Sequence, residues 1–191
     1  MTDRNRLFPI FLKLSGRSVL VVGAGPVASA KLAALVDAGA DIHVVAPEID
    51  PEIEQRGVQV SRRKFRPADL EQTWLVVAAA TPDVNRQVAK EAARRQVFVN
   101  AVDDPANASA YLGGVTRRAG VTFAISTDGS APALAGLLRE GLDAVLPEAD
   151  LGAWVAEAKA MRLQWQRDQV PMADRRPLLL SALMKRYDIE T

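Results

Sequence analysis

RSVLVVGAGPVASAKLAALVDAGA, residues 17–40, is the stretch of sequence that decides the fold. It begins with a β-branched run of strand length, Arg17 to Val22, and it continues as a helical pattern from Pro26 to Ala38 that Gly39 closes. Between the two stands Gly23-Ala24-Gly25. The stretch therefore predicts a strand, a glycine turn and a helix in direct succession.

The same alternation of strand and helix patterns continues down the chain. Further strands are predicted over residues 41–46, 58–62, 73–80 and 97–102, and a helix from Pro82 to Arg95. Residues 73–80 are nearly all apolar, which is typical of a strand buried on both faces of a parallel sheet. The pattern predicts an α/β, doubly wound parallel sheet of the Rossmann type, whose ligands bind beyond the carboxyl ends of the strands.

The pattern changes after Asp103-Asp104-Pro105. A small, glycine-rich segment precedes a strand over 121–126, and a helix is predicted from about Ser130, as its N-cap, to Leu146, with Pro132 in the first turn. Two more helices are predicted over 151–167 and 177–187, separated by a polar break over 169–176. We expect a Rossmann domain over 1–112, a small β/α segment for dimerisation and substrate over 113–147, and a helical tail over 148–191.

Composition narrows the classes of function. The 191 residues hold 24 Lys and Arg against 23 Asp and Glu, so the chain has no strong basic field for nucleic acid. Cysteine is absent, which excludes disulfides, a catalytic thiol and thiolate metal sites. The start, Met1 to Arg6, is polar, and no apolar run is long enough to span a bilayer. We expect a soluble, cytoplasmic protein with no membrane or nucleic-acid partner.

Gly23, Gly25 and Ala28 match the G-x-G-x-x-G/A pattern of dinucleotide-binding turns. The match follows a strand and opens a helix, whose free N–H groups would face a pyrophosphate, although a purely structural turn is the alternative. The second strand ends Val45-Ala46-Pro47 without the usual acid, so Glu48 or Asp50 is expected to reach the ribose. No arginine stands there for a 2′-phosphate, which favours NAD over NADP. The expected cofactor-binding residues of this region are Gly23, Ala24, Gly25, Pro26, Val27, Pro47 and Glu48.

An ordered set of motifs resembles the precorrin-2 dehydrogenase and sirohydrochlorin ferrochelatase family, the N-terminal module of siroheme synthases. The resemblance runs from about Leu7 to Pro147. It is carried by LFPIFL (7–12), LVVGAG (20–25), VVAP (44–47), AAT (79–81), Asn85, VNAVDDP (99–105) and AISTDGSAPAL (124–134).

The resemblance implies that NAD lies over the glycine turn with Thr81 near it, and that Asp103 is the central catalytic residue. Oxidation of precorrin-2 to sirohydrochlorin removes a hydride and a proton, and a carboxylate at a strand end could accept the proton. Spacing alone leaves a second reading open, in which Asp103 and Asp104 only shape a turn before Pro105. We favour catalysis for Asp103 and the turn for Asp104.

Ser126 corresponds to a family segment bordering the tetrapyrrole, whereas Asp128 and Ser130 fit a strand-to-helix connection equally well. The basic runs at 62–64, 94–95, 117–118 and 175–176 could meet substrate carboxylates, but each alone fits a solvated surface. The chain departs from the family pattern near this expected substrate site, at Ala110, Gly113 and Ala131.

The only histidine, His43, lies inside a strand and is expected to be structural, so no metal site is predicted. Iron insertion would then depend on Asp103 as proton acceptor. The resemblance also implies a homodimer.

Three other functions compete with this reading. A short-chain dehydrogenase needs Tyr-x-x-x-Lys, but Val115 follows Tyr111 and Thr191 follows Tyr187 at that spacing. A nucleotide-sensing regulatory module usually keeps the strand-end acid that is missing here. The alternative that stays open is a non-catalytic module that binds a tetrapyrrole or a nucleotide.

Overall fold

The computed structural model describes residues 7–187, which divide into two compact units with the boundary between Leu112 and Gly113. The polar start Met1–Arg6 and the last residues, 188–191, lie outside the described part.

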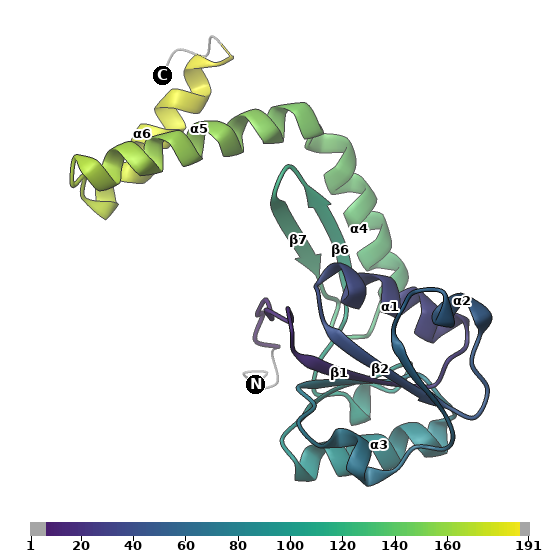
Figure 1. The fold of residues 1–191 in the computed structure, drawn as a ribbon. Coiled ribbons are helices and arrows are strands. Elements are labelled where there is room, and N and C mark those ends of the chain that lie inside the picture. The colour runs from purple at the N-terminus through teal and green to yellow at the C-terminus, as the bar shows by residue number, and fades with distance from the viewer. Residues whose placement is uncertain (1–6, 188–191) are drawn as a thin grey trace, which may run out of the picture. The chain divides into compact units, whose positions relative to one another are not determined.

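The first unit is a five-stranded, wholly parallel sheet with the strand order β3-β2-β1-β4-β5. Helix α1 with the short α2 covers one face of the sheet, and α3 covers the other (Figure 1). This architecture confirms the predicted Rossmann-type doubly wound sheet. The elements are β1 (Ser18–Val22), α1 (Pro26–Asp37), β2 (Asp41–Ala46), α2 (Pro51–Glu54), β3 (Gln59–Arg62), β4 (Leu75–Ala78), α3 (Pro82–Arg94) and β5 (Phe98–Ala101).

Two apolar layers hold the helices against the sheet. Successive strand residues point to opposite faces, so Val21 belongs to the layer under α1 and α2, whereas Leu20 belongs to the layer under α3. Leu32 of α1 and Val88 of α3 are fully buried, one in each layer. β4 is buried along its whole length, as the apolar run predicted.

The crossover from β3 to β4 is a 3₁₀ turn, η1 (Pro67–Leu70), held by one ion pair. Arg63 donates two hydrogen bonds to the carboxylate of Asp69, at 2.6 and 2.8 Å, and the Asp69 side chain is only 6% exposed. Burial by itself raises the pKa of Asp69, but the hydrogen bonds from the Arg63 guanidinium and the Arg66 N–H outweigh it and hold the pKa below its usual value. The pair therefore favours the charged carboxylate in the folded chain.

Asp69→Asn should lower the melting temperature near neutral pH by roughly 3–6 °C, because it replaces a charged acceptor of three hydrogen bonds by an amide. Since the folded-state pKa is depressed, this stabilisation is present above the unfolded value of about 3.9 and is lost as the pH falls through the folded value. Melting temperatures of both proteins, measured by circular dichroism, should begin to approach each other below about pH 4 and should meet only below the folded-state pKa.

Asp83→Asn is the matched control, because Asp83 pairs with Arg86 on the surface of α3 and is almost fully exposed. Exposed pairs contribute little to stability, so this change should leave the melting temperature nearly unaltered at every pH. A pH-independent loss in the Asp69 variant would contradict the role assigned to its charge.

The second unit consists of a hairpin and three helices. β6 (Gly114–Arg118) and β7 (Val121–Ile125) pair antiparallel, and α4 (Pro132–Val145), α5 (Glu148–Arg167) and α6 (Met172–Lys185) follow. Asp143 of α4 joins the hairpin, because it accepts a hydrogen bond from Thr116 Oγ1 at 2.8 Å and pairs with Arg118. No helix within residues 7–187 is both long and apolar enough to cross a membrane.

Three predicted helix starts in this unit are wrong. α5 starts at Glu148 rather than at Leu151. Ser130 is not the N-cap of α4, because Ala131 holds that position and the Ser130 hydroxyl donates to the Thr127 carbonyl oxygen at 2.5 Å. α6 starts at Met172 rather than at Pro177, which lies inside the helix. Pro132 does lie in the first turn of α4, as predicted.

Candidate functional site

The candidate site lies where the carboxyl ends of the five parallel strands meet, which we call the carboxyl edge. Because the strands are parallel and in register, the segments that follow them lie side by side in the order of the strands. The carboxyl edge consists of the segments 62–64, 46–48, 23–25, 79–81 and 102–103. Every cofactor residue and the catalytic residue predicted from the sequence belong to it or to the first turn of α1.

The two glycines of the turn after β1 serve different purposes. Gly23 has φ +102, and a Cβ there would lie 2.2 Å from the carbonyl oxygen of Ala79. Gly25 has an ordinary extended backbone, and a Cβ there would meet nothing within 4 Å among the described residues. Glycine is thus needed at position 23 because the backbone after β4 leaves no room for a side chain. The space over Gly25, in contrast, is open for a ligand.

The start of α1 fits a pyrophosphate. Ala28 is fully buried, so the third position of the motif brings the helix close to the sheet, while Val27 is exposed. The N–H groups of the first helical turn have no intrahelical acceptor, and Pro26-Val27-Ala28 carries no acid that would compete for them. Open space over Gly25 and a positive helix end are the two features that a dinucleotide needs here.

The segment after β2 returns to the glycine turn. The N–H of Asp50 donates to the carbonyl oxygen of Ala24 at 3.2 Å, and Ile49 is buried. Of the two acids expected to reach the ribose, Asp50 accepts a hydrogen bond from the N–H of Glu52 at 3.0 Å and so caps α2. Glu48 and Pro47 are exposed. The geometry therefore leaves Glu48 as the more accessible carboxylate.

Thr81 lies at the N-cap of α3, directly after β4. Buried Asn85 holds this turn, because its Oδ1 accepts the N–H of Ala80 at 2.9 Å and its own N–H donates to the carbonyl oxygen of Thr81. The Thr81 side chain is exposed and makes no capping bond within the described chain. Its hydroxyl is available to a ligand at the carboxyl edge.

Asp103 and Asp104 follow β5 and differ in their surroundings. Asp103 is exposed and has φ +55, a left-handed conformation that aspartate tolerates better than most residues. Asp104 is half-buried, and its Oδ2 accepts a hydrogen bond from Asn107 Nδ2 at 2.7 Å. The local turn thus uses the carboxylate of Asp104 and directs that of Asp103 to solvent.

The chain after this turn is fastened to β5, which fixes the turn at both ends. The N–H of Val99 donates to Ser109 Oγ at 2.9 Å, and the side-chain amide of Asn100 donates to the carbonyl oxygen of Ala110 at 3.0 Å. Asn100 is buried, so this bond is protected from water. Ala110, one of the departures from the family pattern, therefore contributes its backbone to a bond that any residue could make.

Ser126 belongs to the second unit, on the loop between β7 and α4. Its hydroxyl accepts the N–H of Asp128 at 3.1 Å, and its side chain is exposed. Gly113 lies against the same strand, because a Cβ there would fall 2.0 Å from the carbonyl oxygen of Ile125. A role for Ser126 toward substrate stays a prediction.

The basic runs are mostly engaged. Arg94 and Arg95 both pair with Glu91, and the hydrogen bond from Arg95 holds the pKa of Glu91 below its usual value. They stand at the end of α3, which leads to the amino end of β5 and so lies away from the carboxyl edge. Arg118 pairs with Asp143, and Arg175 Nε donates to the Val170 carbonyl oxygen.

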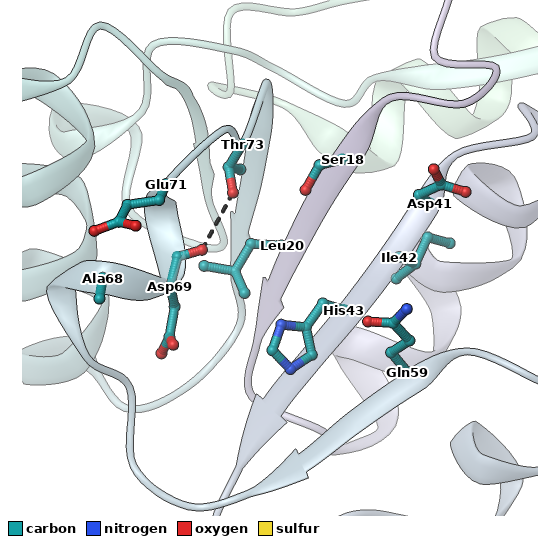
Figure 2. A pocket seen from close by; sticks show the side chains of 10 residues that line it. All are labelled: Ser18, Leu20, Asp41, Ile42, His43, Gln59, Ala68, Asp69, Glu71 and Thr73. Atoms are coloured by element: carbon teal, nitrogen blue, oxygen red, sulfur yellow. Dashed lines mark hydrogen bonds between the residues drawn. The ribbon is translucent and has the colours of Figure 1, made fainter.

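A hollow of about 380 Å³ lies at the opposite, amino-terminal edge of the sheet (Figure 2). Ser18 and Asp41, at the starts of β1 and β2, border it together with Thr73, whose hydroxyl donates to the Asp69 carbonyl oxygen at 3.2 Å. Ligands of this fold collect at the other edge, so the hollow is not the expected cofactor site.

His43 also borders the hollow, and its Nε2 lies 2.9 Å from Ser61 Oγ. His, Asp and Glu side chains nowhere gather in a group of three that could hold a metal ion, as far as residues 7–187 are concerned.

One feature of the carboxyl edge was missed by sequence reasoning. Arg62 is the Cα partner of Ala46, at the end of β2, and pairs with Glu54 of α2. Residues 47–50, directly after β2, hold no arginine, as the sequence indicated, but the register of β3 brings Arg62 beside the end of β2. The position of Arg62 beside Ala46 depends on strand order and register, which belong to the tertiary structure.

Comparison with known proteins supports a dinucleotide-binding site independently of its geometry. Residues 10–114 match the family described as "Putative NAD(P)-binding". The chain is 42% identical over 173 residues to siroheme synthase 3 of Aeromonas hydrophila subsp. hydrophila, which covers 88% of this chain and 37% of that protein. It is 39% identical over 184 residues to siroheme synthase of Photorhabdus laumondii subsp. laumondii, which covers 94% and 39%. The chain thus spans less than two fifths of the length of these curated relatives.

Among solved structures, the chain is similar to SirC, precorrin-2 dehydrogenase. The TM-score is 0.71 and the sequence identity 29%, over 92% of this chain and 88% of that one. The similarity covers both units of the fold. The resemblance noted in the sequence is confirmed by these matches.

Proposed function

The chain belongs to this NAD(P)-binding family, and we propose that it is an NAD-dependent precorrin-2 dehydrogenase of siroheme biosynthesis. The similarity to SirC and to siroheme synthases supports the substrate, and the open glycine turn supports the cofactor. The reaction consumes cellular NAD, so we propose that the protein acts in the cytoplasm.

The carboxyl edge provides the residues that would hold NAD. The N–H groups at the start of α1 and the open space over Gly25 suit the pyrophosphate, Glu48 stands where the ribose of the adenosine half binds in this fold, and Thr81 lies across the turn. When bound, NAD supplies the acceptor for a hydride. The adenosine half at β2 leaves the reacting half on the side of β4 and β5.

The observation that carries the proposal is the position of Asp103 on that side. β5 lies three strands from β2, a separation of about 14 Å at the spacing of neighbouring strands. Asp103 follows β5 with an exposed carboxylate that the local turn does not use. Oxidation of precorrin-2 breaks two bonds to hydrogen, and the Asp103 carboxylate accepts the proton that is lost besides the hydride.

Incubation of the purified chain with precorrin-2 and NAD, followed by absorbance, tests the proposal. We expect NADH and sirohydrochlorin to form in equal amounts, and no reaction without the dinucleotide. Addition of ferrous iron afterwards, as a substrate, would show whether the chain also completes siroheme. NAD binding without any oxidation would contradict the proposal and favour the non-catalytic alternative.

We propose that the chain works as a homodimer through α4. Leu134, Leu137, Leu138 and Val145 lie on this helix with large exposed fractions, 65% for Leu137 and 71% for Val145. A helix of a small unit with so much apolar surface in water favours association. Light scattering at micromolar concentration should therefore give twice the mass of the chain, and Leu137→Glu should shift the protein to monomers.

Leu163→Glu is the control, because Leu163 is similarly exposed, at 57%, but lies on α5. It should leave the mass unchanged. A stable monomer for the unsubstituted chain, or equal dissociation by both variants, would contradict dimerisation through α4.

A further inference from the structure

The carboxyl end of β2, where this fold binds the adenosine ribose, has an unusual residue in the present chain. An acid at the end of β2 commonly binds the 2′-hydroxyl of NAD, and an arginine nearby binds the 2′-phosphate of NADP. β2 ends here in Ala46, which can do neither. Its Cα partner on β3 is Arg62, and neighbouring parallel strands lie about 4.8 Å apart. A guanidinium is thus placed beside the ribose position by the register of the sheet.

Arg62 has a partner that also belongs to this place. Its Nη2 donates to Oε1 of Glu54, the last residue of α2, at 2.6 Å. The two side chains are 54% and 40% exposed, so a ligand at the carboxyl edge can reach both. Exposed ion pairs of this kind contribute little free energy. An anionic ligand can therefore replace Glu54 as the partner of Arg62.

The neighbouring charged groups are less suited to this task. Arg63 is bound to buried Asp69 by two hydrogen bonds, and Asp50 caps α2. Glu48 is exposed and would add negative charge at the ribose. Within residues 7–187, Arg62 is therefore the guanidinium at a strand end whose ion-pair partner, Glu54, is accessible.

We propose that the ion pair of Glu54 and Arg62 sets the choice between NAD and NADP, an inference that rests on the dinucleotide site proposed above. Glu54 occupies the guanidinium and repels a 2′-phosphate, which carries a charge of about −1.5 to −2. Removal of the Glu54 charge leaves Arg62 to bind that phosphate through charge-assisted hydrogen bonds. Glu54 thus disfavours NADP, and Arg62 is the residue that would accept it.

Calorimetric titration of NAD and NADP into four proteins tests this role: the unsubstituted chain, Glu54→Gln, Arg62→Gln and the double variant. The readout is the ratio of the two dissociation constants. Glu54→Gln should shift this ratio toward NADP by about tenfold, and the shift should shrink at high salt. Arg62→Gln in the Glu54→Gln background should abolish the shift. Both side chains are exposed, so all four proteins should fold, which their melting temperatures check.

Glu91→Gln is the matched control, because it also releases arginines from an ion pair, but at the end of α3. It should leave the ratio unchanged. An unchanged ratio in Glu54→Gln, or a shift that persists in the double variant, would overturn the proposal. Binding of neither dinucleotide by the unsubstituted chain would overturn it together with the proposed cofactor site. Normal binding without turnover of precorrin-2 would contradict the proposed function alone.

Discussion

The Asp103→Asn protein is expected to oxidise precorrin-2 roughly 10²–10⁴-fold more slowly than the unsubstituted chain, the usual effect of removing a positioned acid–base group. Asparagine keeps the size of the side chain and tolerates the left-handed backbone at φ +55, so the turn should survive. What is lost is the charge that accepts the proton. Steady-state rates of sirohydrochlorin formation give the effect, and NAD titration with a thermal melt should show values near those of the unsubstituted chain.

Asp104→Asn is the internal control for this experiment. Asp104 accepts a hydrogen bond from Asn107 within the turn, and asparagine retains an oxygen that can accept it. We expect a rate within a few-fold of the unsubstituted chain. If both variants turn over normally, Asp103 is a turn residue, and the assigned proton transfer is wrong.

The glycine turn should respond in opposite ways to substitution at its two glycines. Gly23→Ala should destabilise the first unit by roughly 3 kcal/mol or more, because alanine is strained at positive φ and its Cβ would collide with the Ala79 carbonyl oxygen. Gly25→Leu should leave the fold intact, because the backbone there suits any residue and the Cβ meets open space among the described residues. The leucine side chain would fill the space that a pyrophosphate needs, so saturable NAD binding should disappear.

Two measurements on each variant separate these effects. Chemical denaturation gives the free energy of unfolding, and calorimetry gives the affinity for NAD. A Gly25→Leu protein that binds NAD normally would move the cofactor away from this turn. A Gly23→Ala protein of normal stability would show that the loop after β4 can retreat from Gly23.

Much of the first unit could be predicted because the sequence marks its ends locally. The glycine turn and Pro26 set the start of α1, and Pro47 follows β2, so these boundaries agree with the structure to within a residue. β4 was recognisable by its apolar residues alone. Such signals are properties of neighbouring residues, and they do not require knowledge of the tertiary fold.

The second unit was harder because local preferences compete there. Pro177 resembles a helix start, but the helix begins at Met172 and accommodates the proline within it. Ser130 resembles an N-cap, but its hydroxyl donates to Thr127 instead of accepting from the helix. β6 was missed because its glycine-rich start hides the strand pattern, which becomes regular only through pairing with β7.

The candidate site shows the same division between local and tertiary information. The glycine motif identified the turn, and the resemblance identified Asp103, but neither could separate the tasks of Gly23 and Gly25. The pairing of Arg62 with Glu54 depends on the register between β2 and β3, which no single segment encodes. Side-chain roles set by strand order therefore emerge only from the folded chain.

The contrast between the two glycines bears on how such turns diverge among descendants. A lineage that abandoned dinucleotide binding would experience relaxed selection at Gly25, where a new side chain meets open space. The same lineage would still be constrained at Gly23, because the carbonyl oxygen of Ala79 leaves no room for a Cβ. Retention of the first glycine with drift at the second would then mark a domain that has kept its architecture after losing its cofactor.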